Sequence, residues 1–559
     1  MKIKLSLTTK ITGVALLALV FMAFKSQGSD SEQSLKKEAV VKKKKPNIIF
    51  LLTDDQRYNA LGCMGNKEIQ TPHIDKLAEQ GVVFTNNYNN TAICMGSRAS
   101  IMTGMYEHKT GCNFTHGPLS REKFQKSYPV LLRDAGYYTG FTGKFGFAVK
   151  ETGLENSSYN KKEDMPEDEF DWWAGWPSQG YYQTAKNEHM VKYAEEYPHV
   201  STALGAAAVD FLKQAQNQDK PFCLSVSFKA PHTPVSPDPK FDDVYAGKNF
   251  TKPENFGLKG AEHLPEQSKK GRQYVKLSKK YLSDYDKALA DYYQLIYGVD
   301  QAVGMIYAEL DQQGLLDNTI IIYTTDNGYY LGAHAFGGKV LPYEEGARAP
   351  LIVSGPKKYI KNPGTRSNAL TGSIDMMPTI LDYAGVSIPS NIDGVSITPV
   401  LNGKTDSVKS HQKILQVWGT NATQSLSIVS DGFKYLYWFY GGEGMTPTEE
   451  LYDLKNDPME MHNLASNANH QKTLNKLRAI YDQEVSNWKN ERVEGHSYEM
   501  YDVLFDRHIP WSEKTGLMRK PKEPKQIAAK NTKKISRKHN NKKELHFEVL
   551  FCFNCLCIL

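Results

Sequence analysis

The stretch with the clearest chemical potential is Cys94–Gly104. Gly96 gives the backbone freedom, Ser97 can cap a helix and Gly104 can end it, so the stretch predicts a loop that leads into a short helix. A cysteine close to a helix N-terminus lies where backbone N–H groups attract an anion. Arg98, about one turn further on, adds a planar set of donors that suits a tetrahedral oxyanion. A single cysteine is more often a small buried apolar residue, so this stretch needs support from the rest of the chain.

Two apolar segments are each followed directly by a pair of oxygen-bearing side chains. They are residues 47–53 with Asp54 and Asp55, and residues 319–325 with Asp326 and Asn327. Continuous apolar runs of this length are typical of strands buried on both faces of a parallel sheet, and such sheets bind ligands at the carboxyl ends of their strands. Oxygen ligands without a set of His or Cys residues favour a hard cation, Ca²⁺ or the geometrically stricter Mg²⁺, over zinc.

These side chains need a scaffold, and the chain predicts an α/β fold. Apolar residues recur every three or four positions between Tyr293 and Leu310, which predicts an amphipathic helix before the second strand. The alternation of strands and helices favours a doubly wound, mostly parallel sheet flanked by helices. After Gly403, short runs between Asn, Asp and Gly residues predict a smaller antiparallel sheet and then one helix. The runs are residues 413–418, 426–429 and 435–440, and the helix covers about 467–490.

The two ends of the chain differ in charge from its body. Residues 1–45 contain ten Lys against three acidic residues, and residues 519–550 contain eleven Lys or Arg against three acidic residues, whereas the net charge of the whole chain is only +6. The body is therefore acidic, which argues against nucleic acid as a partner.

The N-terminus has the pattern of a signal peptide. Early lysines precede an apolar run from Ile11 to Phe24, which is too short for a stable membrane span. We therefore expect a periplasmic or secreted protein; an uncleaved amphipathic anchor is the alternative. The predicted parts are a signal peptide at 1–28, a lysine-rich linker at 29–45, a catalytic α/β domain at 46–403, a C-terminal subdomain at 404–517 and a basic, disordered tail at 518–559.

Seven motifs occur in the order found in the formylglycine-dependent type I sulfatases of the alkaline phosphatase superfamily. Between about Lys45 and Val493 the chain resembles this family, and a bacterial polysaccharide or carbohydrate sulfatase in particular. The motifs are Pro46–Arg57, Cys94–Gly104, Gly143-Lys144, Ala230–Pro234, Asp326–Gly328, Tyr343–Pro350 and Glu450–Pro458. Each motif is weak alone, but seven in one order make a specific match.

The resemblance implies a role for each catalytic residue. Cys94 corresponds to the residue that a sulfatase-maturing enzyme oxidises to formylglycine, and Arg98 to the residue that holds the formylglycine hydrate in place. Lys144, His232 and Lys339 resemble the cationic groups around the sulfate, with His232 as proton donor to the leaving oxygen. A sulfate ester is anionic and its departing alkoxide gains charge, so cations and a proton donor are expected to converge there.

The resemblance also implies the cofactor and the reaction. Calcium would be bound by Asp54, Asp55, Asp326, Asn327 and the modified Cys94, with magnesium as the second choice. One hydroxyl of the calcium-bound hydrate attacks sulfur and displaces the alcohol. The other hydroxyl then loses its proton and expels sulfate, which regenerates the aldehyde.

The expected substrate is a sulfated polysaccharide or its oligosaccharides. His334 lies where many relatives have a histidine near the substrate, and Trp173 and Trp176 could stack on sugar rings. A packed aromatic corner is an equal alternative for the two tryptophans. A phosphodiesterase or phosphonate hydrolase of the same superfamily, or a non-catalytic protein that binds sulfated glycans, remains the alternative function.

Two positions depart from the family pattern. Relatives commonly have Pro or Ala at the position of Gly96. They also commonly read Gly-Lys-Trp-His where this chain has Gly-Lys-Phe-Gly, so the histidine that serves sulfate expulsion is replaced by Gly146. The candidates to replace that histidine are His108, His116 and His334.

Overall fold

The computed structural model describes residues 44–156, 159 and 161–518. The predicted signal peptide, nearly all of the linker and all of the predicted tail except Met518 lie outside these residues. The described residues from Pro46 to Met518 belong to one compact unit. None of the described helices is both long and apolar enough to cross a membrane.

An eight-stranded sheet forms the centre of the molecule, with the strand order β10-β2-β9-β8-β1-β7-β4-β6. Its strands are β1 (Asn47–Thr53), β2 (Gly81–Tyr88), β4 (Tyr138–Lys144), β6 (Trp172–Trp176), β7 (Phe222–Ser227), β8 (Thr319–Thr325), β9 (Leu351–Ser354) and β10 (Thr365–Gly372). Only β9 runs antiparallel to its neighbours. A small parallel pair, β3 (Leu119–Ser120) and β5 (Val149–Lys150), lies apart from it. The predicted mostly parallel α/β fold is confirmed.

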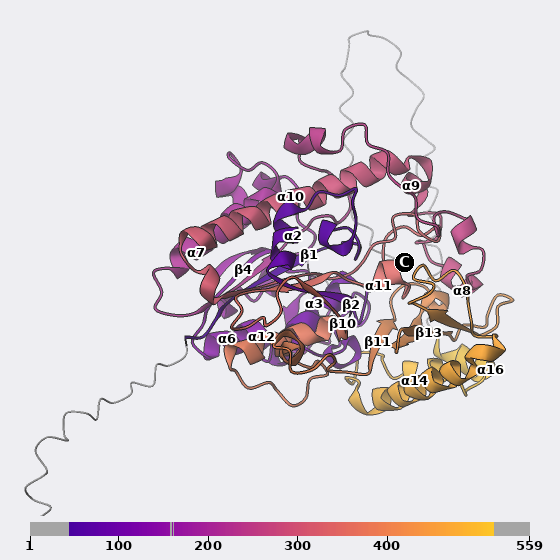
Figure 1. Cartoon of the computed structure of the whole chain (residues 1–559). Coiled ribbons are helices and arrows are strands. Elements are labelled where there is room, and N and C mark those ends of the chain that lie inside the picture. Colours follow the sequence, from indigo (N-terminus) through magenta and orange to yellow (C-terminus); the bar gives the residue numbers. More distant parts are fainter. Residues whose placement is uncertain (1–43, 157–158, 160, 519–559) are drawn as a thin grey trace, which may run out of the picture. The chain divides into compact units, whose positions relative to one another are not determined.

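Helices cover both faces of this sheet (Figure 1). Successive residues of β1 alternate between two cores: Leu51 packs with α2, α7 and α10, and Phe50 packs with α3, α6 and α12. The longer helices are α2 (Pro72–Glu79), α3 (Cys94–Thr103), α6 (Tyr128–Asp134), α7 (Val200–Ala215), α10 (Tyr285–Gln312), α12 (Met376–Ala384) and α14 (Gln471–Glu491). The short ones are α4 (Glu107–Thr110), α5 (Arg121–Phe124), α8 (Glu266–Lys269), α9 (Lys279–Ser283), α11 (Glu344–Ala347), α13 (Thr398–Leu401), α15 (Tyr501–Leu504) and α16 (Trp511–Lys514).

A second, antiparallel sheet follows in the order β11-β12-β13-β14. Its strands are β11 (His411–Gln416), β12 (Ser425–Ser430), β13 (Phe433–Trp438) and β14 (Thr448–Asp453), and α14 packs against it. The first three strands and the helix match the prediction. The sequence pattern missed β14, because its Thr-Glu-Glu start is polar.

The second sheet is joined to the first by specific contacts. Leu415 of β11 forms a parallel bridge with Thr91 and donates its N–H to Asn90 O at 2.7 Å. The buried Lys434 ammonium on β13 lies 2.7 Å from Glu344 and 2.9 Å from Glu460. These contacts fix the C-terminal sheet beside the segment that leads into Cys94.

Candidate active site

The four predicted metal ligands meet at the carboxyl edge of two neighbouring parallel strands. Because β1 and β8 pair in register, Asp54 and Asp55 come out beside Asp326 and Asn327. The N–H of Asp326 donates to Thr53 O at 3.1 Å, and the N–H of Asp55 faces Asp326 Oδ1 at 3.4 Å. All four ligand side chains are buried. The register of two strands 271 residues apart thus assembles the cluster.

This cluster suits a hard cation. Carboxylate oxygens of Asp54, Asp55 and Asp326 lie within 4.8 Å of one another. Asp54 Oδ1 and Asn327 Oδ1 are buried without a hydrogen-bond partner among the described residues. Buried oxygen atoms without donors are costly unless a cation or water satisfies them, and an all-oxygen set is the one Ca²⁺ or Mg²⁺ prefers. The residues present therefore fit a divalent metal.

Cys94 is the first residue of α3 and points into the same cluster. Its sulfur lies with oxygen or nitrogen atoms of Asp54 and His232 in a group spanning less than 4.8 Å. Lys339 Nζ lies 3.4 Å from Cys94 Sγ and 2.5 Å from Asp55 Oδ1. The helix begins earlier than predicted. The N–H of Ser97 donates to Ile93 O at 2.9 Å, so Ser97 already lies inside the helix and is not its cap.

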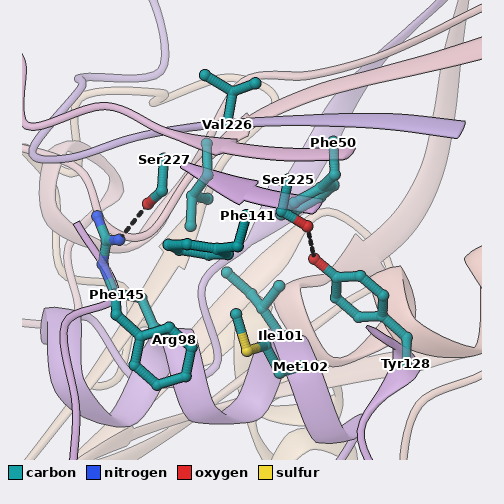
Figure 2. A pocket seen from close by; sticks show the side chains of 11 residues that line it. Phe50, Arg98, Ile101, Met102, Tyr128, Phe141, Phe145, Ser225, Val226 and Ser227 are labelled. Atoms are coloured by element: carbon teal, nitrogen blue, oxygen red, sulfur yellow. Dashed lines mark hydrogen bonds between the residues drawn. The ribbon is translucent and has the colours of Figure 1, made fainter. Parts of the chain in front are cut away.

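Arg98 connects the helix to the strand ends. Its Nε donates to Asp326 Oδ2 at 2.7 Å, and one Nη donates to Lys144 O at 2.7 Å and to Ser227 Oγ at 2.5 Å. Figure 2 shows its side chain reaching from α3 to Ser227 at the end of β7, beside the ring of Phe145. Arg98 therefore orients the carboxylate of Asp326, one of the predicted metal ligands, which is more than the family role implied.

Lys144 ends β4 and donates to the Asp54 carboxylate. Its Nζ also donates to Gln179 Oε1 at 2.7 Å, and the Gln179 amide donates to Tyr159 OH at 3.0 Å. Sequence reasoning missed Gln179, because it belongs to no motif and lies 35 residues from Lys144.

His232 reaches the cluster from the loop after β7. Its Nε2 lies 3.7 Å from Asp55 Oδ2, and its Nδ1 lies 2.5 Å from Thr233 O. Nδ1 therefore carries a proton, and Nε2 is the nitrogen that faces the cluster. Burial, more than any other cause, lowers the pKa of His232 well below its usual value; Lys339 and Lys144 lower it further, whereas Asp54 opposes them.

Burial and charge interactions give the acids of the cluster different pKa values. Burial would raise the pKa of Asp54, but neighbouring cations, Lys144 foremost, hold it well below its usual value. Burial raises the pKa of Asp326 to about 6, and Asp54 adds to the rise. Burial also raises the pKa of Asp55, so the cluster contains one firmly ionised carboxylate and two whose pKa values are raised in the absence of a metal.

The same loop brings a lysine that sequence reasoning did not select. Lys229 is 2 % exposed, and its Nζ lies 5.0 Å from the ring centre of Tyr182. Burial, followed by Lys144, lowers its pKa to about 8. The hydroxyl of Tyr182 donates to His232 O at 2.6 Å. The only sequence signal for Lys229 was its position three residues before His232.

Gly146 leaves no room for the histidine of the family. A Cβ atom there would lie 2.5 Å from Arg98 Cδ, and the backbone has φ of +92°, where side chains are strained. The Arg98 side chain therefore occupies the space over Gly146.

The three histidines suggested as replacements lie elsewhere. His108 is buried between the rings of Tyr106 and Trp488. His116 stacks on Tyr498, and its Nδ1 lies 2.8 Å from His496 O. These contacts correct the expectation that either ring replaces the family histidine.

His334 is also misplaced by the sequence analysis. It has no exposed surface; its Nδ1 lies 2.7 Å from Gly260 O, and its Nε2 lies 3.0 Å from the Asn255 amide. A ring enclosed in this way cannot contact a substrate, so its predicted binding role is wrong, and it does not replace the family histidine either.

Of the two tryptophans predicted to stack on sugars, Trp176 is buried and Trp173 is partly buried against the core. Trp173 stacks on Phe141 with ring centres 5.1 Å apart, and Phe145 and Phe170 pack against it. Trp176 is 4 % exposed. The packed aromatic corner, the alternative considered above, is what the structure shows.

The close surroundings of Gly96 explain the other departure from the family pattern, the glycine in place of Pro or Ala. A Cβ atom on Gly96 would lie 2.9 Å from Glu107 Oε2. The buried Glu107 accepts hydrogen bonds from Thr91 at 2.5 Å, Asn113 at 2.7 Å and Tyr498 at 2.9 Å. Glycine therefore lets the Cys94 helix approach this carboxyl group.

Glu107 is expected to make stability depend on pH. Burial raises its pKa from 4.5 to about 7, so the folded state holds this proton more tightly than the unfolded chain. The resulting stabilisation is complete below pH 4.5 and is lost as pH rises through 7. The free energy of unfolding of wild type should therefore fall by about 3 kcal/mol relative to Glu107→Gln between pH 4.5 and about pH 8. Urea titrations at several pH values measure this difference, and parallel curves for the two proteins would contradict it.

Comparison with known proteins identifies the family. A model of the sulfatase family matches residues 46–386, and a model of the C-terminal region of N-sulphoglucosamine sulphohydrolase matches residues 332–487. The chain is 29% identical over 533 residues to an N-acetylglucosamine-6-O-sulfatase of Bacteroides thetaiotaomicron, covering 83% of this chain and 90% of the relative. It is 31% identical over 379 residues to the human N-acetylglucosamine-6-sulfatase, covering 65% of each chain.

The fold agrees with this assignment. A solved structure, a complex with its substrate D-glucosamine-2-N,6-O-disulfate, superimposes with a TM-score of 0.65 at 25% identity, covering 82% of this chain and 100% of the other. The matched region contains the cysteine helix, both strands that carry the acids, and the surrounding lysines. The chain belongs to the sulfatase family and is a sulfuric ester hydrolase.

Proposed function

We propose that this protein hydrolyses sulfate esters of sulfated sugars, with Cys94 converted to formylglycine and a bound calcium ion. The observation that carries the proposal is the position of the Cys94 side chain. Its sulfur lies 3.4 Å from Lys339 Nζ and within 4.8 Å of ligand atoms of Asp54 and His232, and Lys144 pairs with the same Asp54 carboxylate. A nucleophile placed beside a cation site and several cationic groups suits attack on an anionic ester.

The metal would be held by Asp54, Asp55, Asp326, Asn327 and the modified Cys94. It would supply positive charge that favours the ionised form of the nucleophile. Calcium is preferred to magnesium because the family usually binds it and because the site offers several carboxylate oxygens.

The side chains of this chain would divide the remaining work. Lys339 and Lys144 would bind the sulfate oxygens. The attacking hydroxyl of the hydrated aldehyde passes its proton to the unprotonated His232 Nε2 and forms the bond to sulfur. The bond between sulfur and the ester oxygen breaks, and His232 Nε2 delivers that proton to the leaving oxygen. The second hydroxyl then loses its proton, the carbon–oxygen bond to sulfate breaks, and the aldehyde re-forms. Water restores the hydrate.

The substrate class follows from the relatives. One relative is named for N-acetylglucosamine 6-sulfate, and a solved structure holds a sulfated glucosamine. We infer that this chain acts on a sulfated carbohydrate after export to the periplasm or the medium, and that a sulfatase-maturing enzyme modifies it. Release of sulfate from glucosamine 6-sulfate, but not of phosphate from matched phosphate esters, tests this proposal. Phosphate release alone would favour the phosphodiesterase alternative.

Asp326→Asn is expected to remove stabilisation by calcium. Asparagine keeps an oxygen for Arg98 Nε but loses the charge that the ion requires, so the variant should fold. Calcium at about 100 times its Kd should stabilise wild type by about 2.7 kcal/mol and leave the variant unchanged. Thermal unfolding with calcium and with chelator measures this effect. Asp300→Asn is the matched control, because Asp300 is a buried carboxyl that instead accepts the N–H groups of His73 and Ile74 at 2.9 and 2.8 Å. Equal calcium shifts in wild type and Asp326→Asn would rule out this metal site.

A further inference from the structure

One partly buried tryptophan, Trp418, is connected to the active site through a series of contacts but has no role in the site described above. Trp418 follows β11 and belongs to the C-terminal sheet region. The parallel bridge pairs Leu415 with Thr91, and both Trp418 and Cys94 lie three residues after their bridge residue. Because parallel segments advance together, the bridge directs Trp418 toward the same end of the molecule as Cys94.

A chain of contacts links Trp418 to Lys144. The ring of Phe114 lies 6.4 Å from that of Trp418 and 5.3 Å from that of Tyr159, centre to centre. Tyr159 accepts a hydrogen bond from Gln179, which in turn binds Lys144. The rings of Tyr159 and Phe114 therefore connect Gln179, the partner of Lys144, with Trp418.

A second connection reaches Trp418 from the side of Lys339. The Arg272 guanidinium lies 4.9 Å from the centre of the Trp418 ring. The loop that follows Arg272 is fixed to the segment before Lys339, since Gly337 N–H donates to Gln273 O at 2.8 Å and Val275 N–H donates to Ala335 O at 2.9 Å. Contacts thus connect Trp418 both with Gln179, which binds Lys144, and with the segment before Lys339.

Arg272 is a cation without a carboxylate partner among the described residues. It is exposed, and no ion pair involves it in the part of the chain that the structure describes. When an arginine stacks on an indole, its N–H groups point outward in the plane of the guanidinium, where they can bind a carboxylate or sulfate. The indole beside it offers an apolar surface that suits the C–H face of a pyranose ring.

We propose that Trp418 and Arg272, with Phe114 behind them, bind the sugar residue next to the one that loses its sulfate, and that this neighbouring residue carries a carboxylate or sulfate. The inference rests on the proposed function and deepens it, because it makes the enzyme selective for anionic oligosaccharides over single sugars. It also assigns to the C-terminal sheet region a part of substrate recognition that Trp173 and Trp176 cannot supply.

Binding without turnover tests the proposal. The probes are a heparin tetrasaccharide with 6-O-sulfated glucosamine at its non-reducing end, and glucosamine 6-sulfate alone. Calorimetry measures their Kd for Cys94→Ala and for the same protein carrying Trp418→Ala or Arg272→Ala. Each added change should weaken tetrasaccharide binding about tenfold and alter monosaccharide binding less than about twofold. Arg272→Ala should also flatten the salt dependence of tetrasaccharide binding, and Trp418→Tyr should restore most of the affinity.

Lys358→Ala is the matched control. Lys358 also lies over an aromatic ring, that of Tyr359 at 5.0 Å. It donates to Asn318, which precedes β8, at the end of that strand opposite Asp326. It should leave both affinities unchanged. The proposal is overturned if the tetrasaccharide binds no more tightly than the monosaccharide, or if the Trp418 and Arg272 variants keep full tetrasaccharide affinity. The proposed function is judged separately, by sulfate release from nitrophenyl sulfate by the protein that retains Cys94.

Discussion

Cys94→Ala is expected to abolish hydrolysis of every sulfate ester, from a sugar sulfate to nitrophenyl sulfate, by on the order of 10⁵-fold or more. The substitution removes the only side chain in the cluster that maturation can convert into a nucleophile. Folding should be retained, because alanine fits the first position of α3 and leaves the Lys339 ammonium paired with Asp55. Initial rates on both substrates, with unfolding curves for each protein, measure the effect.

The control for this prediction is Cys112→Ala. Cys112 is also buried near α3, with its sulfur 4.0 Å from Met95 O, but it lies outside the oxygen cluster. It should retain activity on both substrates. Substantial turnover of nitrophenyl sulfate by Cys94→Ala would show that another group attacks sulfur.

His232→Ala is expected to affect substrates according to their leaving groups. A sugar alkoxide is a poor leaving group that needs a proton in the transition state, so hydrolysis of the sugar sulfate should fall by about 10²- to 10⁴-fold. Nitrophenolate leaves without a proton, so its sulfate ester should lose less than about tenfold. The ratio of kcat/KM values for the two esters, in wild type and variant, measures this difference.

His508→Ala serves as the matched control, because His508 is exposed and contacts Asp482 in the C-terminal region, where its Nε2 lies 3.3 Å from a carboxylate oxygen. It should change neither rate. Equal losses on both esters in His232→Ala would assign His232 to sulfate binding. The buried rings of His108 and His334 could not then supply the acid, and His116 is held by Tyr498 and the carbonyl oxygen of His496.

The parts of the site that follow from local sequence were predictable. The two apolar strands and the acids that end them needed only the rule that parallel strands place their carboxyl ends together. The helix after Cys94 was predicted, but its start was not, since the capping preference of Ser97 gave way to a backbone bond to Ile93. Local propensity therefore located the elements better than their boundaries.

The parts that depend on distant contacts were not predictable. Arg98 binds Asp326, which lies 228 residues away, and no pattern in the sequence specifies that pair. Aromatic composition identified Trp173 and Trp176, but composition cannot tell a packed ring from an accessible one. The bridge between Leu415 and Thr91, which connects the strand before Trp418 with the segment before Cys94, links residues more than three hundred positions apart.

The mass of the Cys94 peptide tests the central claim most directly. The protein is produced together with a sulfatase-maturing enzyme, digested and compared with a matured sulfatase from the same cells. Our account predicts that the –CH₂SH group of Cys94 becomes –CHO, with sulfur lost and oxygen gained, and that Gly96 does not prevent this conversion. An intact thiol on Cys94, in cells that mature the comparison sulfatase fully, would contradict the account.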